Sequence, residues 1–278
     1  MSMENATTTA AGGAHGAEHS IGDAILHHVH DTNVIDIWPL GHITLPDNWY
    51  LFGINFSPTK HLLLMWVASI LLIAVFSLAF RKTRPVPTGL ANALEAITVF
   101  LRDEVILPAI GEDGKRYLPY LLSVFFFILC CNLLGLVPYS STATGNVTVT
   151  AALALLSLVM IQLGGIRQHG LWHHLHNLVP PGIPAWLLPI MIPVEIMGQF
   201  TKPFALCIRL YANMTAGHLV ILSFLALIFV MKTVFVAPIS VGFALFINLL
   251  EVFIAFLQAY IFTLLTALFM GMTIHPEH

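Results

Sequence analysis

The fold is decided by residues 190–231, which read IMIPVEIMGQFTKPFALCIRLYANMTAGHLVILSFLALIFVM. This stretch is apolar over about twice the length of an ordinary membrane span, because a hydrocarbon core of about 30 Å needs only roughly 20 helical residues. A second long apolar stretch follows Lys232 and Pro238. The two stretches predict a membrane hairpin over residues 186–232 and 237–273, whose helices must tilt strongly or bend to fit the bilayer.

Three shorter apolar stretches precede the hairpin. Each has about the length that one crossing of the bilayer requires, so we expect spanning helices over residues 61–80, 118–137 and 147–163. Residues 88–110 differ, because apolar side chains recur there at helical spacing with charged side chains between them, which is typical of a helix lying on the membrane surface. The predicted fold class is an all-α polytopic membrane protein, with these four helices and the tilted hairpin forming one membrane domain over residues 60–278.

The composition excludes a soluble enzyme. Of the 278 residues, 58% are hydrophobic and 9% charged, whereas an ordinary soluble domain has about 45–50% and about 25%. The net charge of −3 argues against nucleic acid as a partner. The three cysteines, two of them adjacent, form neither a disulfide framework nor a metal or redox pair.

Two histidine clusters, within residues 27–30 and 173–176, are the candidates for a metal site. Neither cluster has the HExxH spacing or an evident acidic partner. Solvated imidazoles are the better interpretation, so we expect neither a metal site nor a cofactor.

Basic residues predict the orientation of the spans. Residues 1–59 contain six acids and no Lys or Arg, whereas six basic residues lie between the first two spans and Arg167 follows the third. Cytoplasmic loops are enriched in Lys and Arg. We therefore expect residues 1–59 to form an extracytoplasmic, periplasmic-side segment, with the amino terminus outside and the carboxyl terminus in the cytoplasm.

Ionisable side chains inside the first long stretch point to function. Glu195, Lys202 and Arg209 follow one another at intervals of seven residues, so they share one side of a helix that turns about 100° per residue. Asn213 lies one turn further along that side, and His218 points to roughly the opposite side. Because an ionisable group at the membrane centre costs about 2.5–3.5 kcal/mol on insertion scales, such groups usually face a bundle interior or a water-filled cavity.

The second long stretch carries polar groups that match those of the first. Glu251 and Gln258 are seven residues apart and share a face, and Asn248 precedes them. In an antiparallel hairpin, residues at one depth have numbers with a constant sum, here about 468 for a turn near residue 234. We hypothesise that Gln258 lies opposite Arg209 and holds it at mid-membrane, and that His218 and Glu251 form a titratable pair nearer the outer surface.

Simpler roles are open to several of these side chains. A lone His, Asn or Gln in a membrane helix often serves as an interhelical hydrogen-bond partner rather than a proton carrier. Glu195 and Lys202 lie near the cytoplasmic end, where a long side chain can reach the headgroups. Arg209 differs, because its guanidinium stays protonated and no acid on its stripe is nearer than Glu195, so it needs a partner from elsewhere.

Two segments carry a specific family resemblance: KPFALCIRLYANMTAGH at residues 202–218 and EVFIAFLQAYIFTLLTALFM at residues 251–270. Together with CNLLGLVPYS around Asn132 and HNLVPPGIPAWLLPI before the hairpin, they resemble subunit a of F-type ATP synthases. The resemblance covers most of the chain from about residue 60. It implies a stator subunit, not an enzyme on its own, whose two tilted helices curve beside a rotating ring of c subunits that each carry a mid-membrane carboxylate.

The resemblance also implies residue roles. Arg209 matches the essential arginine that faces the ring carboxylate and makes it release its proton, and Gln258 matches the neighbour that positions this arginine. The other polar groups match or accompany the lining of two offset aqueous half-channels: Asn213, His218, Glu251 and Asn248 for the outer one, Glu195 and Lys202 for the inner one. The expected function is therefore to couple proton flow to ring rotation and ATP synthesis.

The implied partners are the c-subunit ring, the peripheral-stalk b subunits, the rest of the ATP synthase and the lipid bilayer. The implied location is the bacterial cell inner membrane, with the mitochondrial inner membrane as the alternative. Many bacterial members have an acid at the position of His218 and a histidine at that of Glu251, and this joint exchange supports a pair. Gly135 replaces an acid found in some members, so we assign it no role.

Two other functions fit an apolar chain with buried charges. A secondary transporter or ion channel could use Arg209 and Glu251 as a self-contained site, although such transporters usually show internal repeats and broken helices, and we find no repeat. A membrane scaffold with buried polar contacts is disfavoured by the seven-residue stripe and the double register. The sequence leaves protons and sodium ions open, and His218 with Glu251 favours protons.

Overall fold

The computed structural model describes residues 34–37, 41–44, 50–51, 54–55, 60–81, 88–137, 142–170, 187–231 and 236–275. Within them, five helices are long and apolar enough to cross a membrane: α2 (Lys60–Ala79), α5 (Gly114–Gly135), α6 (Val147–His169), α8 (Leu188–Met231) and α9 (Val236–Ile274). The predicted all-α polytopic class is confirmed.

Two short strand pairs precede the first span, which the sequence did not lead us to expect. Strand β1 (Val34–Ile37) pairs antiparallel with β2 (Gly41–Thr44), and β3 (Tyr50–Leu51) pairs antiparallel with β4 (Ile54–Asn55). These four strands fall in the segment predicted to lie outside the membrane. They do not alter the helical class of the membrane domain.

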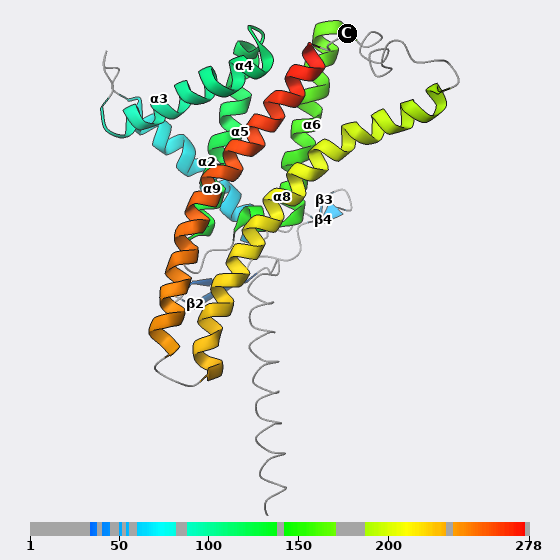
Figure 1. Cartoon of the computed structure of the whole chain (residues 1–278). Coiled ribbons are helices and arrows are strands. Elements are labelled where there is room, and N and C mark those ends of the chain that lie inside the picture. The colour runs from blue at the N-terminus through cyan, green and yellow to red at the C-terminus, as the bar shows by residue number, and fades with distance from the viewer. Residues whose placement is uncertain are drawn as a thin grey trace, which may run out of the picture.

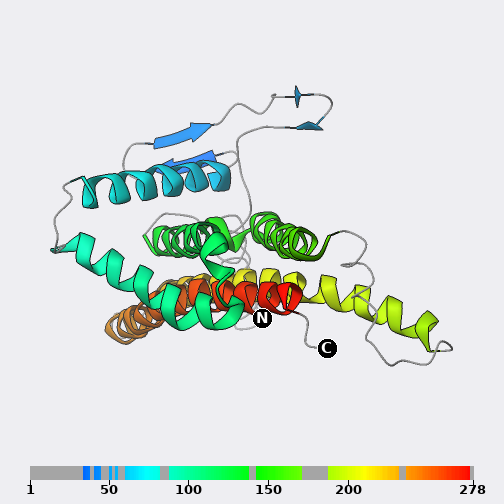
Figure 2. The ribbon, with the colours of Figure 1, turned by 90° about the horizontal axis from the view of Figure 1, so that it is seen from above.

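The helices form three layers, seen from above in Figure 2. Helix α2 lies on one face, α5 and α6 form the middle, and α8 and α9 form the opposite face (Figures 1 and 2). Apolar residues fill the contact between the middle layer and the hairpin, and Leu121, Ile128, Leu210 and Met270 are almost fully buried there. The middle layer therefore covers one side of the hairpin, and residues 101–110 also pack on α9 near its carboxyl end.

Helix α6 is longer than predicted. We expected a span over 147–163 that the glycine pair Gly164–Gly165 would close, but the helix continues to His169 and ends at Gly170, whose φ is 76°. A Cβ added at Gly164 would lie 3.5 Å from the Tyr117 hydroxyl and 3.6 Å from side-chain atoms of α9. The glycine therefore serves close packing rather than termination.

The predicted surface helix over 88–110 is divided into three parts. Helix α3 (Leu90–Phe100) passes into a π-helical turn, η1 (Leu101–Ile106), and then into the short α4 (Leu107–Ile110). The π turn carries Leu101, Val105 and Ile106 into the core, as expected where an extra residue lets a helix re-aim its apolar face. The chain is thus helical from Leu90 to Ile110, close to the predicted bounds, but with a π turn that the sequence did not lead us to expect.

Two exposed ion pairs lie near this part of the chain. Arg102 Nε donates to Asp103 at 2.7 Å, and Lys115 Nζ donates to Glu112 at 2.5 Å. The hydrogen bond and charge of Lys115 lower the pKa of the Glu112 carboxyl from its ordinary value. Both pairs are local contacts on the surface, and such pairs contribute little to stability.

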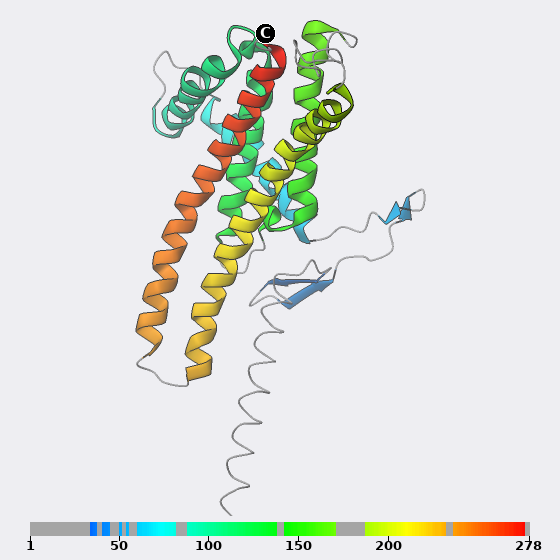
Figure 3. The ribbon, with the colours of Figure 1, turned by 45° about the vertical axis from the view of Figure 1, so that its right-hand side comes forward.

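The long helix α8 is unbroken despite Pro193 and Pro203. Its first part leans away from the other helices before the chain runs down beside α9 (Figures 1 and 3). The prolines thus accompany a bend and not a break. Lys232, which marks the predicted turn, and both histidine clusters lie outside the described residues.

Candidate functional site

All eight predicted site residues lie on the two hairpin helices. Five come from α8 and three from α9. Glu251 and Gln258 are buried, each with a relative exposure of 6%. The others are half-buried: Glu195, Lys202, Arg209, Asn213, His218 and Asn248.

Three contacts between α8 and α9 fix the register of the hairpin. Near the turn, the rings of Phe224 and Phe243 stack with centroids 5.5 Å apart. Further along, the carboxylate of Glu251 lies against the backbone of Gly217. Toward the carboxyl end of α9, Lys202 Nζ lies 5.1 Å from the ring centroid of Phe269.

The residue numbers of these pairs sum to 467, 468 and 471 in that order. The predicted constant of about 468 is therefore confirmed near the turn and in the middle of the hairpin. The sum is three to four higher at the end of the hairpin away from the turn, as expected for helices that diverge or tilt relative to each other. Arg209 and Gln258 lie between the Gly217–Glu251 contact and the Lys202–Phe269 contact, whose sums are 468 and 471.

Glu251 occupies a space that exists because residue 217 has no side chain. A Cβ built on Gly217 would overlap the Glu251 carboxylate. The carboxylate thus lies directly on α8, beside the residue that precedes His218. Glu251 makes no side-chain hydrogen bond or ion pair with any residue that the structure describes, so the predicted bonded His218–Glu251 pair stays a prediction.

Arg209 has an unusual environment for a membrane arginine. It is half-buried, and within the described part of the chain no side chain hydrogen-bonds or ion-pairs with its guanidinium. Gln258 is buried on α9 at the matching register, but no hydrogen bond joins it to Arg209. The predicted partnership of Gln258 with Arg209 therefore stays a prediction.

The opposite side of α8 packs against α6 and against the turn at residues 143–145 that precedes it. Thr150 Oγ1 lies 3.4 Å from Cys207 Sγ, and Thr215 Oγ1 donates to the Gly145 carbonyl at 3.4 Å. Cys207 lies about 160° around the helix from Arg209. The arginine therefore points away from this packed seam.

A second contact between α6 and α8 lies toward the end of α6. Gln162 Nε2 donates to Gln199 Oε1 at 2.7 Å. Gln199 lies between Glu195 and Lys202 along α8. Sequence reasoning missed both glutamines and Gly217, although a glutamine inside an apolar span is the same kind of signal as Gln258.

A buried polar link also joins the middle layer to α9. Asn132 is fully buried on α5, donates from Nδ2 to the Ala255 carbonyl at 3.4 Å, and accepts from Thr144 Oγ1 at 2.7 Å. Thr144 belongs to the short 3₁₀ turn η2 (Ala143–Gly145). This link holds α9 at the level between Glu251 and Gln258.

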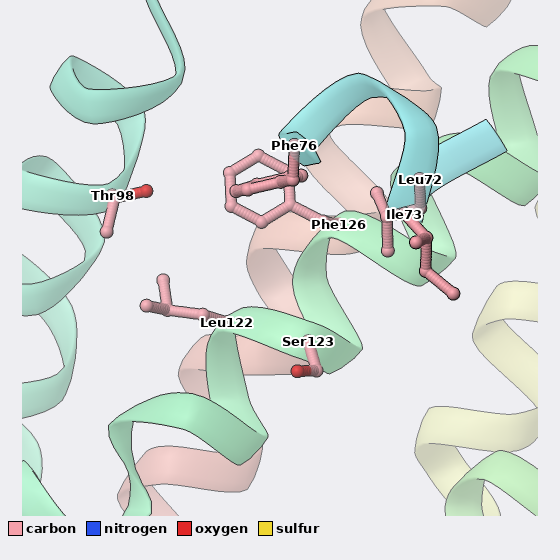
Figure 4. Close-up of a pocket in the computed structure, with 7 residues that line it drawn as sticks. All are labelled: Leu72, Ile73, Phe76, Thr98, Leu122, Ser123 and Phe126. Carbon is pink, nitrogen blue, oxygen red and sulfur yellow. The ribbon is translucent and has the colours of Figure 1, made fainter. Parts of the chain in front are cut away.

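An apolar pocket of about 260 Å³ lies elsewhere, between α2, α3 and α5. Figure 4 shows Phe76 and Phe126 close together on one side of it and Thr98 on the other. It contains no ionisable side chain and touches neither hairpin helix. Among the described residues no cluster of His, Cys, Asp or Glu could hold a metal ion. The candidate site remains the polar side chains of the hairpin.

Comparison with known proteins decides the family. The family model described as ATP synthase A chain matches residues 62–271. The chain belongs to the ATP synthase subunit a family. The match runs from α2 through most of α9 and so includes every member of the polar lining.

Individual members of the subunit a family are similar over almost the whole chain. ATP synthase subunit a of Chloroherpeton thalassium is 51% identical over 263 residues, covering 92% of this chain and 78% of the relative. That of Pelodictyon phaeoclathratiforme is 46% identical over 289 residues, covering 100% and 84%. That of Anaeromyxobacter dehalogenans is 49% identical over 279 residues, covering 94% and 73%.

Membership of the subunit a family identifies the chain as a component of an ATP synthase and, together with the five candidate spans, as a bacterial membrane protein. The described spans are each continuous, whereas secondary transporters typically bind substrate at broken helices. The described spans therefore lack the broken helices that a secondary transporter would typically show.

Proposed function

We propose that this chain is the proton-translocating stator subunit of a rotary ATP synthase. It provides two offset aqueous half-channels and an arginine that makes the c-ring carboxylate release its proton. The observation that carries the proposal is Arg209, a half-buried membrane arginine with no hydrogen-bond or ion-pair partner within the described part of its own chain. Because a guanidinium in the membrane needs an acidic or carbonyl partner, we assign that partner to another subunit.

The surface beside Arg209 suits the approach of a partner helix. Ala205, Ala212 and Ala216 are exposed and lie within about 60° of the arginine around α8. Small residues let two membrane helices pack closely. A ring helix on this surface would bring its carboxylate toward the guanidinium, which points away from the seam with α6.

The mechanism follows from charge and burial. A ring carboxylate opposite Arg209 is stabilised in its ionised form and releases its proton. Once the carboxylate has moved on to face lipid, the ionised form is costly, so it takes a proton from the other half-channel. Because Arg209 stays protonated, it cannot pass a proton directly between the half-channels. A membrane potential supplies about 2.3 kcal/mol per charge per 100 mV to drive this cycle.

The outer half-channel is assigned to Asn213, His218, Asn248 and Glu251, and the inner one to Glu195 and Lys202. The burial of Glu251 against Gly217 supports the first assignment, because a carboxylate next to backbone needs water or a neighbouring histidine to stabilise its charge. Gln258, buried at the register of Arg209, is assigned to hold the guanidinium when the ring is present.

The decisive experiment is Arg209→Ala in the assembled ATP synthase. We expect no detectable coupled ATP synthesis, while the c-ring and the peripheral-stalk b subunits still co-purify with the chain. Arg102→Ala is the matched control, because Arg102 is exposed and paired with its neighbour Asp103, and it should retain normal coupling. Normal coupling in Arg209→Ala would overturn the proposal.

A second experiment separates this function from that of a self-contained transporter. We expect the chain to be isolated together with a c-ring and stalk, and the purified chain alone to conduct no ions in liposomes. We place the complex in the bacterial cell inner membrane with the amino terminus outside. Ion flux through the isolated chain would favour the transporter.

A further inference from the structure

One polar contact links the middle layer to the part of α8 that precedes Arg209. Gln162 of α6 donates to Gln199 of α8 at 2.7 Å, and both side chains are half-buried. A polar group left bare in hydrocarbon costs free energy. The part of the Gln199 amide that hydrogen-bonds no described residue therefore needs water or another polar group.

Gln199 lies next to the charged stripe. It is four residues after Glu195 and three before Lys202, which places it about 40° and about 60° around the helix from them. Cys207, which contacts Thr150 of α6, instead lies about 160° from Arg209. Of the described side-chain contacts between α6 and α8, the glutamine pair is the one that reaches the stripe.

The hydrogen bond from Gln162 uses only the Oε1 acceptor of Gln199, so both N–H donors of the Gln199 amide stay available. Gln199 Oε1 accepts that bond, and its Nε2 group makes no hydrogen bond with any described residue. Residues four apart on a helix have Cβ atoms about 5–6 Å apart. The Nε2 donors can thus reach the Glu195 carboxylate or a water molecule beside it.

The other flank of the stripe is formed by α9. Lys202 Nζ lies over the Phe269 ring at 5.1 Å. Polar groups from α6 and α8 and an aromatic ring from α9 therefore surround the same stretch of α8. Ionisable groups at this end of the bundle include Arg167 and His169 on α6, and His275, whose Nε2 lies 3.5 Å from Asp113 Oδ2.

We infer that Gln162 lines the cytoplasmic half-channel and is a positioning residue, which orients the Gln199 amide toward Glu195 and the water beside it. The inference rests on the proposed function and extends it to α6, a helix to which no part of the proton route has been assigned. In this arrangement the Gln162 amide fixes the orientation of the Gln199 amide, and the Gln199 amide solvates the Glu195 carboxylate.

The first test is aqueous access. In a background with Cys130, Cys131 and Cys207 replaced by alanine and coupled synthesis retained, Gln162→Cys should react with a membrane-impermeant, positively charged methanethiosulfonate added to the cytoplasmic face of inverted vesicles. Leu163→Cys is the matched control, because Leu163 is adjacent, at the same depth and 51% exposed on the outside of α6, and it should not react. Equal reactivity of the two positions, or no reaction at Gln162→Cys, would overturn the inference.

The second test separates positioning from helix packing. Gln162→Leu and Gln199→Leu should each slow ATP-driven proton pumping severalfold relative to ATP hydrolysis, and the double variant should be no slower than either single one. Thr150→Val removes another contact between the same helices, with Cys207, and should leave the ratio of pumping to hydrolysis unchanged. Additive losses, or an equal loss in Thr150→Val, would show a purely structural role.

The two proposals fail in different ways. If Arg209→Ala keeps coupling, the proposed function is wrong whatever happens at Gln162. If Arg209→Ala abolishes coupling but Gln162→Cys stays unreactive, only the assignment of Gln162 is wrong.

Discussion

At the scale of single residues, the position of the Glu251 carboxylate depends on a missing side chain. Gly217→Ala would place a methyl group on the carboxylate, and overpacking of this kind costs about 1–3 kcal/mol. We expect a lower melting temperature of the purified complex and strongly reduced proton pumping, measured in inverted vesicles.

Gly198→Ala is the control on the same helix. A Cβ at Gly198 meets no atom within 4 Å, and replacing a helical glycine by alanine gains about 0.5–1 kcal/mol. This variant should be as stable as the parent or more so, with unchanged pumping. If Gly217→Ala is equally stable and pumps protons equally well, the close packing of Glu251 on α8 is not needed for stability or proton pumping.

The proposed partnership of His218 and Glu251 makes a separate prediction. In a charge swap, His218→Glu and Glu251→His should each impair coupled ATP synthesis, and the double variant should recover a measurable part of it. The reason is that the exchange restores one acid and one imidazole at a shared depth, which the register of the hairpin supports. A double variant no better than either single one would contradict the pair.

The sequence was sufficient to find the charged residues but not their contacts. Intervals of seven identified the stripe through Arg209, and the hairpin register followed from the turn near residue 234, because antiparallel helices leave little freedom at a known turn. The contact of Glu251 with Gly217 was not predictable, since a glycine gives no hydrophobic or charge signal. Gln162 was missed for another reason: its partner Gln199 belongs to a different helix.

At the scale of helices, α9 is anchored by the buried amide of Asn132. Asn132→Leu would leave the Thr144 hydroxyl without its acceptor in a fully buried site, and an unsatisfied buried polar group costs about 1–3 kcal/mol. We expect the complex to unfold at a lower temperature in a thermal melt. Adding Thr144→Val should recover most of the loss, because replacing both partners by apolar groups can be nearly neutral. An equally unstable double variant would show that Asn132 acts mainly through Ala255.

Helix boundaries were predicted to within a few residues wherever composition changes sharply. The hairpin helices begin and end close to the predicted positions because lysine and proline separate two uniformly apolar stretches. The predicted end of α6 was wrong because glycine can either end a helix or allow close packing within it. Gly164 allows close packing with side chains of α9, whereas Gly170 ends the helix. The π turn η1 (Leu101–Ile106) was not predictable, because no local pattern marks it; in the structure it accompanies the packing of η1 and α4 on α9.

At the scale of the whole molecule, the three layers leave two large apolar faces, and only one carries Arg209. Helix α2 exposes residues such as Ile73, 66% accessible, on the far side from the hairpin. The proposed function requires the c-ring to lie on the hairpin face and not on the α2 face. Cysteines at Ala205 and Ala212, which are exposed beside Arg209, should therefore form disulfide cross-links with cysteines near the ring carboxylate.

Ile73→Cys tests the opposite face in the same membranes and should give no cross-link to the ring subunit. Yield measured on non-reducing gels should also fall when rotation is allowed by adding ATP before the oxidant, because each ring subunit then passes Arg209 only briefly. Cross-linking from Ile73→Cys with none from Ala205→Cys would show that the α2 face, and not the hairpin face, contacts the ring. That result would leave Arg209 facing lipid, where an unpaired guanidinium is too costly to be retained.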